Sequence, residues 1–165
     1  MKRFLVLALV LIPTASLAFQ NEQDGFRGIP WGTSRAATEG MFPVKSIDPQ
    51  NTVCQRKGDG LKIGAAELES ISYMYWEDQL WAVFIRSSGY QNSTRLKEAL
   101  SAQFGPGKQT NPLIERYIWL GAVTNIVYTW NPYSKDATLT FFSVQIGAER
   151  KAGREKDALD AAKDF

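Results

Sequence analysis

The chain has 165 residues, of which 19 are Lys or Arg and 17 are Asp or Glu, with one cysteine and no histidine. The absence of histidine excludes Ser-His-Asp and Cys-His catalysis and the usual zinc sites. The sequence also contains no P-loop, EF-hand loop or G-x-S-x-G motif. We therefore expect no enzymatic activity, no catalytic residues, no cofactor and no metal site.

The first eighteen residues have the pattern of a secretory signal peptide. Lys2 and Arg3 precede an apolar run over residues 4–12, and Ser16 and Ala18 are small residues at the −3 and −1 positions of a cleavage site. The run is too short for a membrane span, which needs roughly 20 residues. We expect cleavage near Ala18 and a soluble exported product, periplasmic or secreted, since no lipoprotein cysteine follows the site.

Cleavage would change the charge of the chain. Loss of Lys2 and Arg3 leaves 17 residues of each sign, and a neutral surface has no long-range field for nucleic acid or anionic lipid. No second apolar stretch approaches spanning length, so we expect no nucleic-acid partner and no membrane span. We assign residues 19–146 to one α+β domain. Residues 147–165 are highly charged and are predicted to form a helix or a disordered tail.

The first half of the chain predicts one short helix and then strands. Thr33 or Ser34 can cap the helix, and Gly40 and Pro43 can end it. We predict, in order, a helix over 35–40, a loop over 44–51, and strands over 52–55, 61–64, 68–76 and 80–87. The last two strands form a hairpin through residues 77–79. A turn at Asp78-Gln79 would place these neighbours together: Trp76 opposite Trp81, Met74 opposite Val83, and Tyr73 and Tyr75 on the face of Phe84 and Ala82.

The second half predicts a helix followed by three strands. Leu96, Leu100 and Phe104 recur at helical spacing, Asn92 or Ser93 can cap the helix, and the glycines after Phe104 end it. We predict a helix over 94–104 and strands over 113–120, 123–130 and 137–146. The order helix, strands, helix, strands indicates an α+β fold with an antiparallel sheet and helices packed on one face.

The aromatic content suggests a binding surface. If helices cover one sheet face, aromatic side chains on the other face could bind an envelope protein or a glycan, although they could instead build the core. Any residue on the helix-facing side would belong to the core. The candidate platform residues are Tyr73, Tyr75, Trp76, Trp81 and Trp130.

The sequence leaves open two alternative functions and two possible states of the single cysteine. One alternative is a small-molecule site between the sheet and the segment from Phe26 to Trp31, which would require an enclosed cavity. A more distant one is a glycan hydrolase using Glu67 and Glu69, which would share one face of a strand. Cys54 has no intramolecular partner, so we expect a buried thiol or, alternatively, a Cys54-linked dimer.

The segment from Phe26 to Ser34 resembles the opening of small exported bacterial proteins that begin with an F-x-G-I-x-W-G-[TS] motif. The resemblance extends to the hairpin at 73–85, the helix end at 104–106 and a later strand bearing Trp119. The order of elements also resembles β-lactamase-inhibitor proteins and small outer-membrane-assembly lipoproteins, which implies protein binding. This chain lacks the lipoprotein cysteine and the paired disulfide cysteines expected of those relatives.

Overall fold

The computed structural model describes residues 19–164, so the expected signal peptide at residues 1–18 lies outside the described residues. Two helices and twelve strands are formed there, followed by a short 3-10 turn at Ala162–Asp164. The strands are β1 (Gly25–Phe26), β2 (Ile29–Pro30), β3 (Met41–Ser46), β4 (Asn51–Arg56), β5 (Lys62–Ile63), β6 (Ala66–Glu67), β7 (Ser70–Trp76), β8 (Gln79–Ser87), β9 (Lys108–Gln109), β10 (Arg116–Leu120), β11 (Thr124–Trp130) and β12 (Ala137–Ser143). The helices are α1 (Tyr90–Phe104) and α2 (Val144–Ala161). Within residues 19–164, neither helix is long and apolar enough to cross a membrane.

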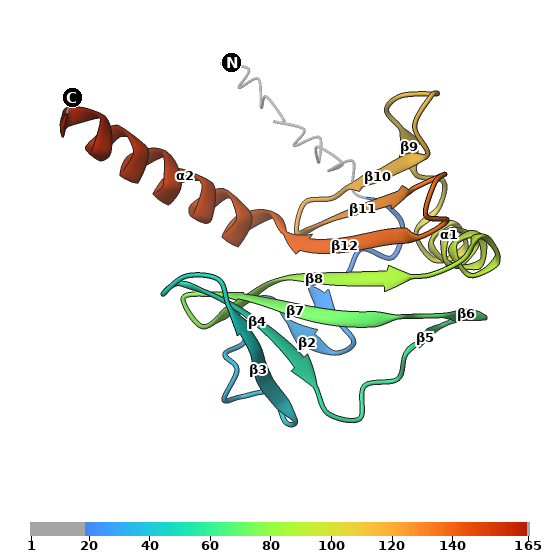
Figure 1. Ribbon diagram of the computed structural model, residues 1–165, viewed down its shortest axis with the longest axis horizontal. Helices are drawn as coiled ribbons and strands as arrows, with labels where there is room; N and C mark the ends of the chain where they lie inside the picture. The colour runs from blue at the N-terminus through green and yellow to red at the C-terminus, as the bar shows by residue number, and fades with distance from the viewer. Residues whose placement is uncertain (1–18, 165) are drawn as a thin grey trace, which may run out of the picture.

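Eight strands form one antiparallel sheet in the order β3-β4-β7-β8-β12-β11-β10-β9 (Figure 1). Two small hairpins, β1-β2 and β5-β6, lie outside it. Buried and partly exposed residues alternate along β7, β11 and β12, as expected where a sheet packs on one side only. The expected α+β fold with an antiparallel sheet is confirmed.

The chain before β4 differs from the expectation. Residues 35–40 form separate turns rather than a helix, with hydrogen bonds such as Ala37 N–H to the Ser34 carbonyl at 3.2 Å. Residues 41–46, partly expected as loop, form the edge strand β3 because they pair with β4. Tertiary pairing here outweighs the local cap and stop signals.

The β7-β8 hairpin turns one residue earlier than expected. Glu77 and Asp78 have φ of 48° and 60°, so they form the two-residue turn with positive φ that suits a twisted hairpin. Trp76 is therefore opposite Gln79, and a bulge between Met74 and Tyr75 shifts the register by one residue. The expected pairings of Trp76 with Trp81 and of Met74 with Val83 are wrong.

The shifted register also changes the faces of the hairpin. Tyr73 pairs with Val83, whereas Phe84 pairs with Ser72 on the opposite face of the sheet. The expectation that Tyr73 and Tyr75 share a face with Phe84 and Ala82 is therefore wrong. Moving the turn by one residue changes each pairing by two residues and keeps the faces. The bulge between Met74 and Tyr75 shifts the pairing by one residue, which moves Phe84 and Ala82 to the other face.

Helix α1 begins at Tyr90, four residues before the expected start. Gly89, with φ of 82°, precedes it, and no side chain caps its N-terminus. The expected cap Ser93 is instead buried within the helix, where its hydroxyl lies 3.3 Å from that of Ser87. The expected apolar stripe is confirmed, since all three of its members are buried: Leu96, Leu100 and Phe104.

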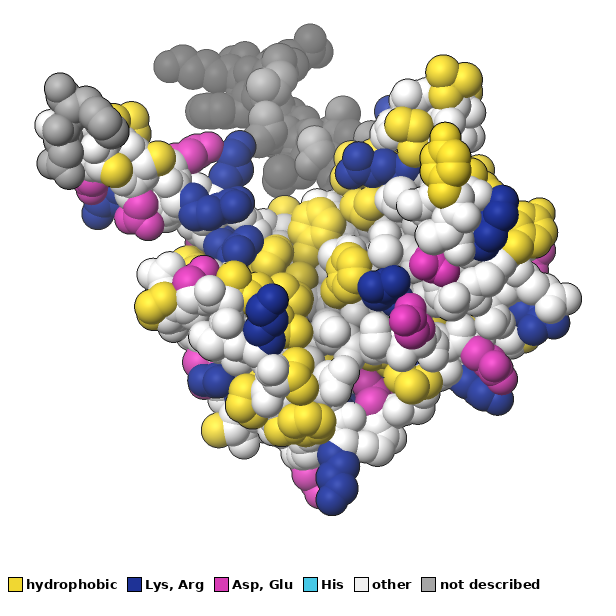
Figure 2. All heavy atoms as spheres, in the orientation of Figure 1, with side chains coloured by type: hydrophobic (Ala, Val, Ile, Leu, Met, Phe, Trp, Pro, Cys, Tyr) yellow, Lys and Arg dark blue, Asp and Glu magenta, His cyan; other side chains and the backbone are white. Residues whose placement is uncertain are grey.

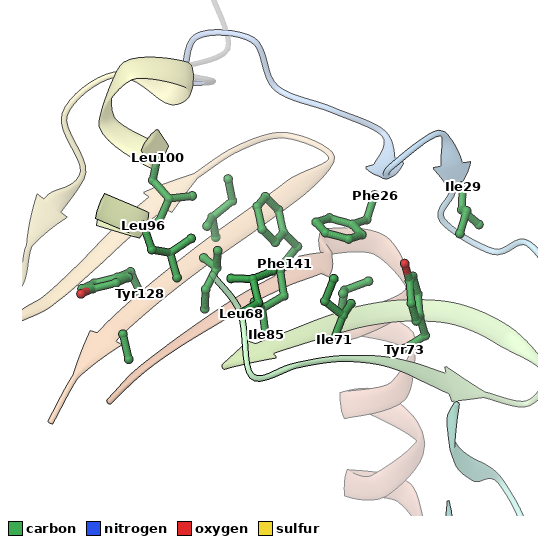
Figure 3. Close-up of a cluster of buried hydrophobic side chains, with 14 of the residues drawn as sticks. Phe26, Ile29, Leu68, Ile71, Tyr73, Ile85, Leu96, Leu100, Tyr128 and Phe141 are labelled. Carbon is green, nitrogen blue, oxygen red and sulfur yellow. The ribbon is translucent and has the colours of Figure 1, made fainter. Parts of the chain in front are cut away.

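The core lies between α1, the N-terminal segment and one face of the sheet (Figure 3). The Phe26 ring lies 5.2 Å from that of Phe141 on β12 and 6.1 Å from that of Tyr73 on β7. From α1, the Phe104 ring approaches Phe141 at 5.9 Å. The two covering elements thus meet over the middle strands.

Polar contacts fix the N-terminal segment in this position. Arg27 donates to Asp59 Oδ1 at 2.6 Å, and the Tyr73 hydroxyl donates to Asp59 Oδ2 at 2.6 Å. Burial and this hydrogen bond raise the pKa of Tyr73, which stays protonated as a donor. On the other side, Trp31 Nε1 donates to Thr124 Oγ1 at 2.7 Å.

The C-terminal tail is helical from Val144, so β12 is shorter than expected. Ser143 caps the helix by accepting from the Ile146 N–H at 3.2 Å. Ile146 is the one buried residue of α2 among those whose side chains are described. Beyond its first turns, α2 projects away from the sheet (Figure 1).

We predict that replacing two adjacent phenylalanines on β12 lowers the stability of the protein by very different amounts. Phe141→Ala removes a core side chain and should lower the free energy of unfolding by about 3–5 kcal/mol. Phe142→Ala, on the uncovered face, should cost about 1 kcal/mol. Urea denaturation of both variants measures the difference, and equal losses would contradict the one-sided packing.

Candidate functional site

The face of the sheet opposite α1 is not covered by any other described element except at one end. We call it the open face, and it is turned to the viewer in Figures 1 and 2. Hydrophobic side chains gather over its middle strands (Figure 2). The strand register places these large apolar residues there, each of them partly exposed: Val53, Met74, Trp76, Phe84, Ile118, Val127 and Phe142.

The apolar residues of the open face lie in two neighbouring rows, of which the row of Val53, Met74, Ala82 and Phe142 is apolar across four strands. Phe84 on β8 lies beside Thr140 on β12, which lies beside Val127 on β11. In the next row, Phe142 is opposite Ala82. Ala82 is 1% exposed although no helix covers it, so its larger neighbours shield it. The centre of the face is therefore mainly apolar, with the hydroxyl side chains of Ser72 and Thr140 on either side of Phe84.

Only part of the platform expected from sequence lies on this face. Tyr73 and Tyr75 are 0% and 1% exposed and belong to the core, because the hairpin register turns them toward α1. Trp130 shares the covered face with Ala137 and packs against Tyr90 of α1 at 5.9 Å between rings. These three residues are removed from the candidate site. Phe84 and Phe142 replace them, and Phe84 lies on this face because of the bulge between Met74 and Tyr75.

Trp76 and Trp81 mark the end of the open face next to α2. The Trp81 ring lies at the bulge of β8, and the Arg150 guanidinium stacks 4.2 Å from its centre. Arg150 also donates to Asn51 Oδ1 at 3.1 Å, and Asn51 is opposite Trp76. The first turns of α2 therefore form a wall at this end.

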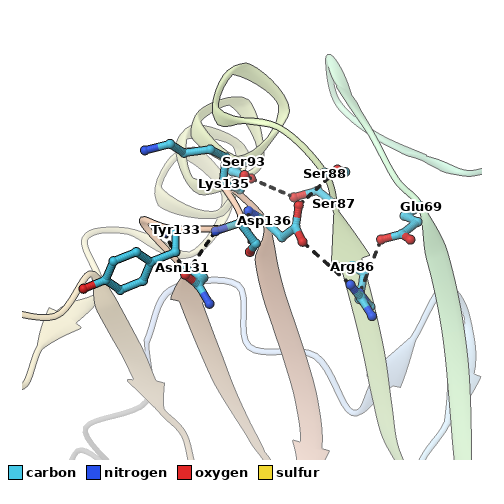
Figure 4. A network of polar contacts seen from close by, with 10 residues as sticks. Glu69, Arg86, Ser87, Ser88, Ser93, Asn131, Tyr133, Lys135 and Asp136 are labelled. Atoms are coloured by element: carbon cyan, nitrogen blue, oxygen red, sulfur yellow. Dashed lines mark hydrogen bonds and ion pairs between the residues drawn. The ribbon is translucent and has the colours of Figure 1, made fainter.

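The opposite end of the open face is polar (Figure 4). Arg86 lies between two carboxylates, with Glu69 at 3.3 Å and Asp136 at 3.8 Å. Ser88 donates to Asp136 at 3.0 Å. Arg86 is 46% exposed, so these ion pairs add little to stability and chiefly hold the arginine beside the apolar rows.

The space proposed for a small molecule is filled. Phe26 and Ile29 are buried against the sheet, so the N-terminal segment contacts the core directly. A groove of about 640 Å³ lies along this segment, lined by Glu22 to Gly25 and Arg27 to Pro30. Its lining includes Arg27, which is already bound to Asp59.

The two carboxylates of the proposed hydrolase are not arranged as an acid and base. Glu67 lies on the separate hairpin β5-β6 and pairs with Lys62 at 3.8 Å, whereas Glu69 pairs with Arg86. Both are more than half exposed, at 69% and 51%. Each carboxylate thus has its own cation, and the expected shared strand face is wrong. The described residues also hold no group of three side chains suited to a metal ion.

Comparison with protein-family models, with curated proteins and with solved structures finds no match to this chain. The resemblance to exported proteins with the F-x-G-I-x-W-G-[TS] opening stays a prediction. Function must therefore be argued from the surface itself.

Cys54 is fully buried on the covered face of β4. Burial raises the pKa of its thiol above the ordinary 9.0, which leaves little thiolate at neutral pH. A Cys54-linked dimer would therefore require β4 to open.

We predict that Cys54 is unreactive in the folded protein. Labelling by a thiol reagent at pH 8 should be at least ~100-fold slower in buffer than in urea, because both access and thiolate are lacking. The native rate should still rise above pH 9.0, since the folded pKa is raised. Rapid native labelling at pH 7 would contradict the burial of this thiol.

Proposed function

We propose that this protein is a non-catalytic binding module of the bacterial cell envelope, exported after cleavage near Ala18, which binds another protein through the open face. The observation that carries the proposal is an uncovered sheet face whose middle rows are aromatic and aliphatic. An antiparallel sheet with one face in water normally presents polar residues there. Here Met74, Phe84 and Phe142 occupy the centre.

The composition of the open face favours a protein over other ligands. Aromatic residues and methionine are enriched at the centres of protein interfaces, and large apolar patches on monomers are often interaction sites. Aliphatic side chains such as Val127 and Ile118 lie among the aromatic ones.

The core does not require these side chains. Phe84 and Phe142 point away from α1, so replacing them leaves the contacts of Phe141 and Tyr73 unchanged. Their retention on a water-facing surface is explained by burial in a complex, which would remove apolar area from water at about 25 cal/mol per Å².

We predict that capture of an envelope partner depends on the open face. The purified protein, immobilised and incubated with an envelope fraction, should retain a stoichiometric partner. The double variant Phe84→Ser, Phe142→Ser should lower that retention at least ~10-fold, because the centre of the interface is lost.

Leu113→Ser is the matched control, since Leu113 is a 92% exposed apolar residue outside the open face. It should retain the partner like the unaltered protein, and thermal unfolding should show that both proteins are folded. Equal retention by the open-face double variant would reject the proposal.

A further inference from the structure

The ionisable residues on the strands of the open face are all basic. The register places one such residue on each of four strands, and no Asp or Glu is placed there. These residues are Lys45 on β3, Arg86 on β8, Lys108 on β9 and Arg116 on β10. Arg150 of α2 adds a fifth cation at one end. The full chain carries a formal charge of only +2, so the single sign of these strand residues is not a consequence of a basic protein.

The cations lie along three sides of the apolar rows. Lys45 lies at the β3 edge beside Val53, while Lys108 and Arg116 lie at the far edge, with Lys108 opposite Ile118. Arg150 closes the end formed by α2. The aromatic centre is therefore flanked by positive charge on three sides.

Most of these cations lack a carboxylate partner. Arg86 takes both neighbouring acids, Glu69 and Asp136. Among the side chains that the structure describes, Lys45, Lys108 and Arg116 form no ion pair. Arg150 forms no ion pair within 4.0 Å among the described side chains, although the Asp48 carboxylate is near enough to interact with its charge. Covering these groups with a neutral or basic surface would desolvate unpaired charge, which is unfavourable.

We propose that the open face binds an acidic protein segment in which apolar side chains alternate or are interspersed with carboxylates. The apolar side chains contact Phe84, Phe142 and Met74, and the carboxylates pair with Lys45, Arg116 and Arg150. This inference rests on the proposed function and specifies the chemistry of its partner. Complementary charge would both steer the encounter and select against basic partners.

The width of the sheet sets the size of the segment. Six strand spacings of about 4.8 Å separate β3 from β10, a span of about 29 Å. A partner segment crossing the strands in extended form covers this span in about nine residues at roughly 3.3 Å each. A segment of that length can reach cations at both edges while its middle lies on the aromatic rows.

Synthetic peptides test this chemistry directly. Three twelve-residue peptides share Phe and Leu at the same positions and carry Glu, Gln or Lys at all others. Binding to the purified protein is measured by fluorescence anisotropy in 50 mM and 300 mM NaCl. We expect the Glu peptide to bind at least ~10-fold tighter than the Gln peptide at low salt and to lose most of that advantage at high salt, with the Lys peptide weakest.

Charge reversal assigns the effect to the open face. Lys45→Glu with Arg116→Glu should weaken binding of the Glu peptide at least ~10-fold and strengthen binding of the Lys peptide. Lys156→Glu with Lys163→Glu is the matched control, because it changes the net charge equally at exposed residues of the distal part of α2 and of the 3-10 turn that follows it. Phe84→Ser should weaken binding of the Glu peptide at least ~5-fold, which distinguishes docking on the open face from non-specific electrostatic attraction.

Three results would overturn the proposal of an acidic partner segment. They are no binding of the Glu peptide at 1 mM, equal binding of all three peptides, or equal effects of the charge reversals on the open face and in the control. Failure of this inference is separable from failure of the proposed function. Capture of an envelope partner that depends on Phe84 and Phe142 but is unaffected by Lys45→Glu and Arg116→Glu rejects the acidic partner alone. Capture independent of Phe84 and Phe142 rejects both.

Discussion

One-sided covering of the sheet is the constraint on which the rest of this structure depends. An antiparallel sheet has two faces, and the described chain provides α1 and the N-terminal segment for one of them. Adjacent residues of β12 show the consequence. Phe141 packs between Phe26 and Phe104, whereas Phe142, one residue later, faces outward beside Ala82. The same alternation that builds the core therefore also creates the apolar open face.

The most distinctive sequence motif of the chain serves the covered face. Gly25 lies so close to β2 that a Cβ atom would be 2.0 Å from the Ile29 carbonyl oxygen, and Gly28 has φ of 74°. These glycines let the segment turn tightly, which directs Phe26 into the core and Trp31 toward Thr124. Packing and turn geometry thus account for the motif. A shared motif of this kind indicates shared architecture rather than a shared ligand.

The residues of the covered face were more predictable from the sequence than those of the open face. The stripe of Leu96, Leu100 and Phe104 was predictable because helical periodicity is redundant over three turns. The face of Phe84 was not, since it depends on a bulge that only the pairing of β8 with β7 defines. The start of α2 was missed for a related reason: the alternation of β12 continues into Ile146, which is buried by the helix instead.

The account predicts that the open face is accessible in the free protein and covered in its complex. Hydroxyl-radical footprinting of both states, read by mass spectrometry, measures this residue by residue. Met74, Trp76 and Phe142 should be oxidised in the free protein and protected on binding, while the buried Tyr73 stays unmodified in both states. Protection of these residues in the free protein, or their unchanged oxidation in the complex, would contradict the account.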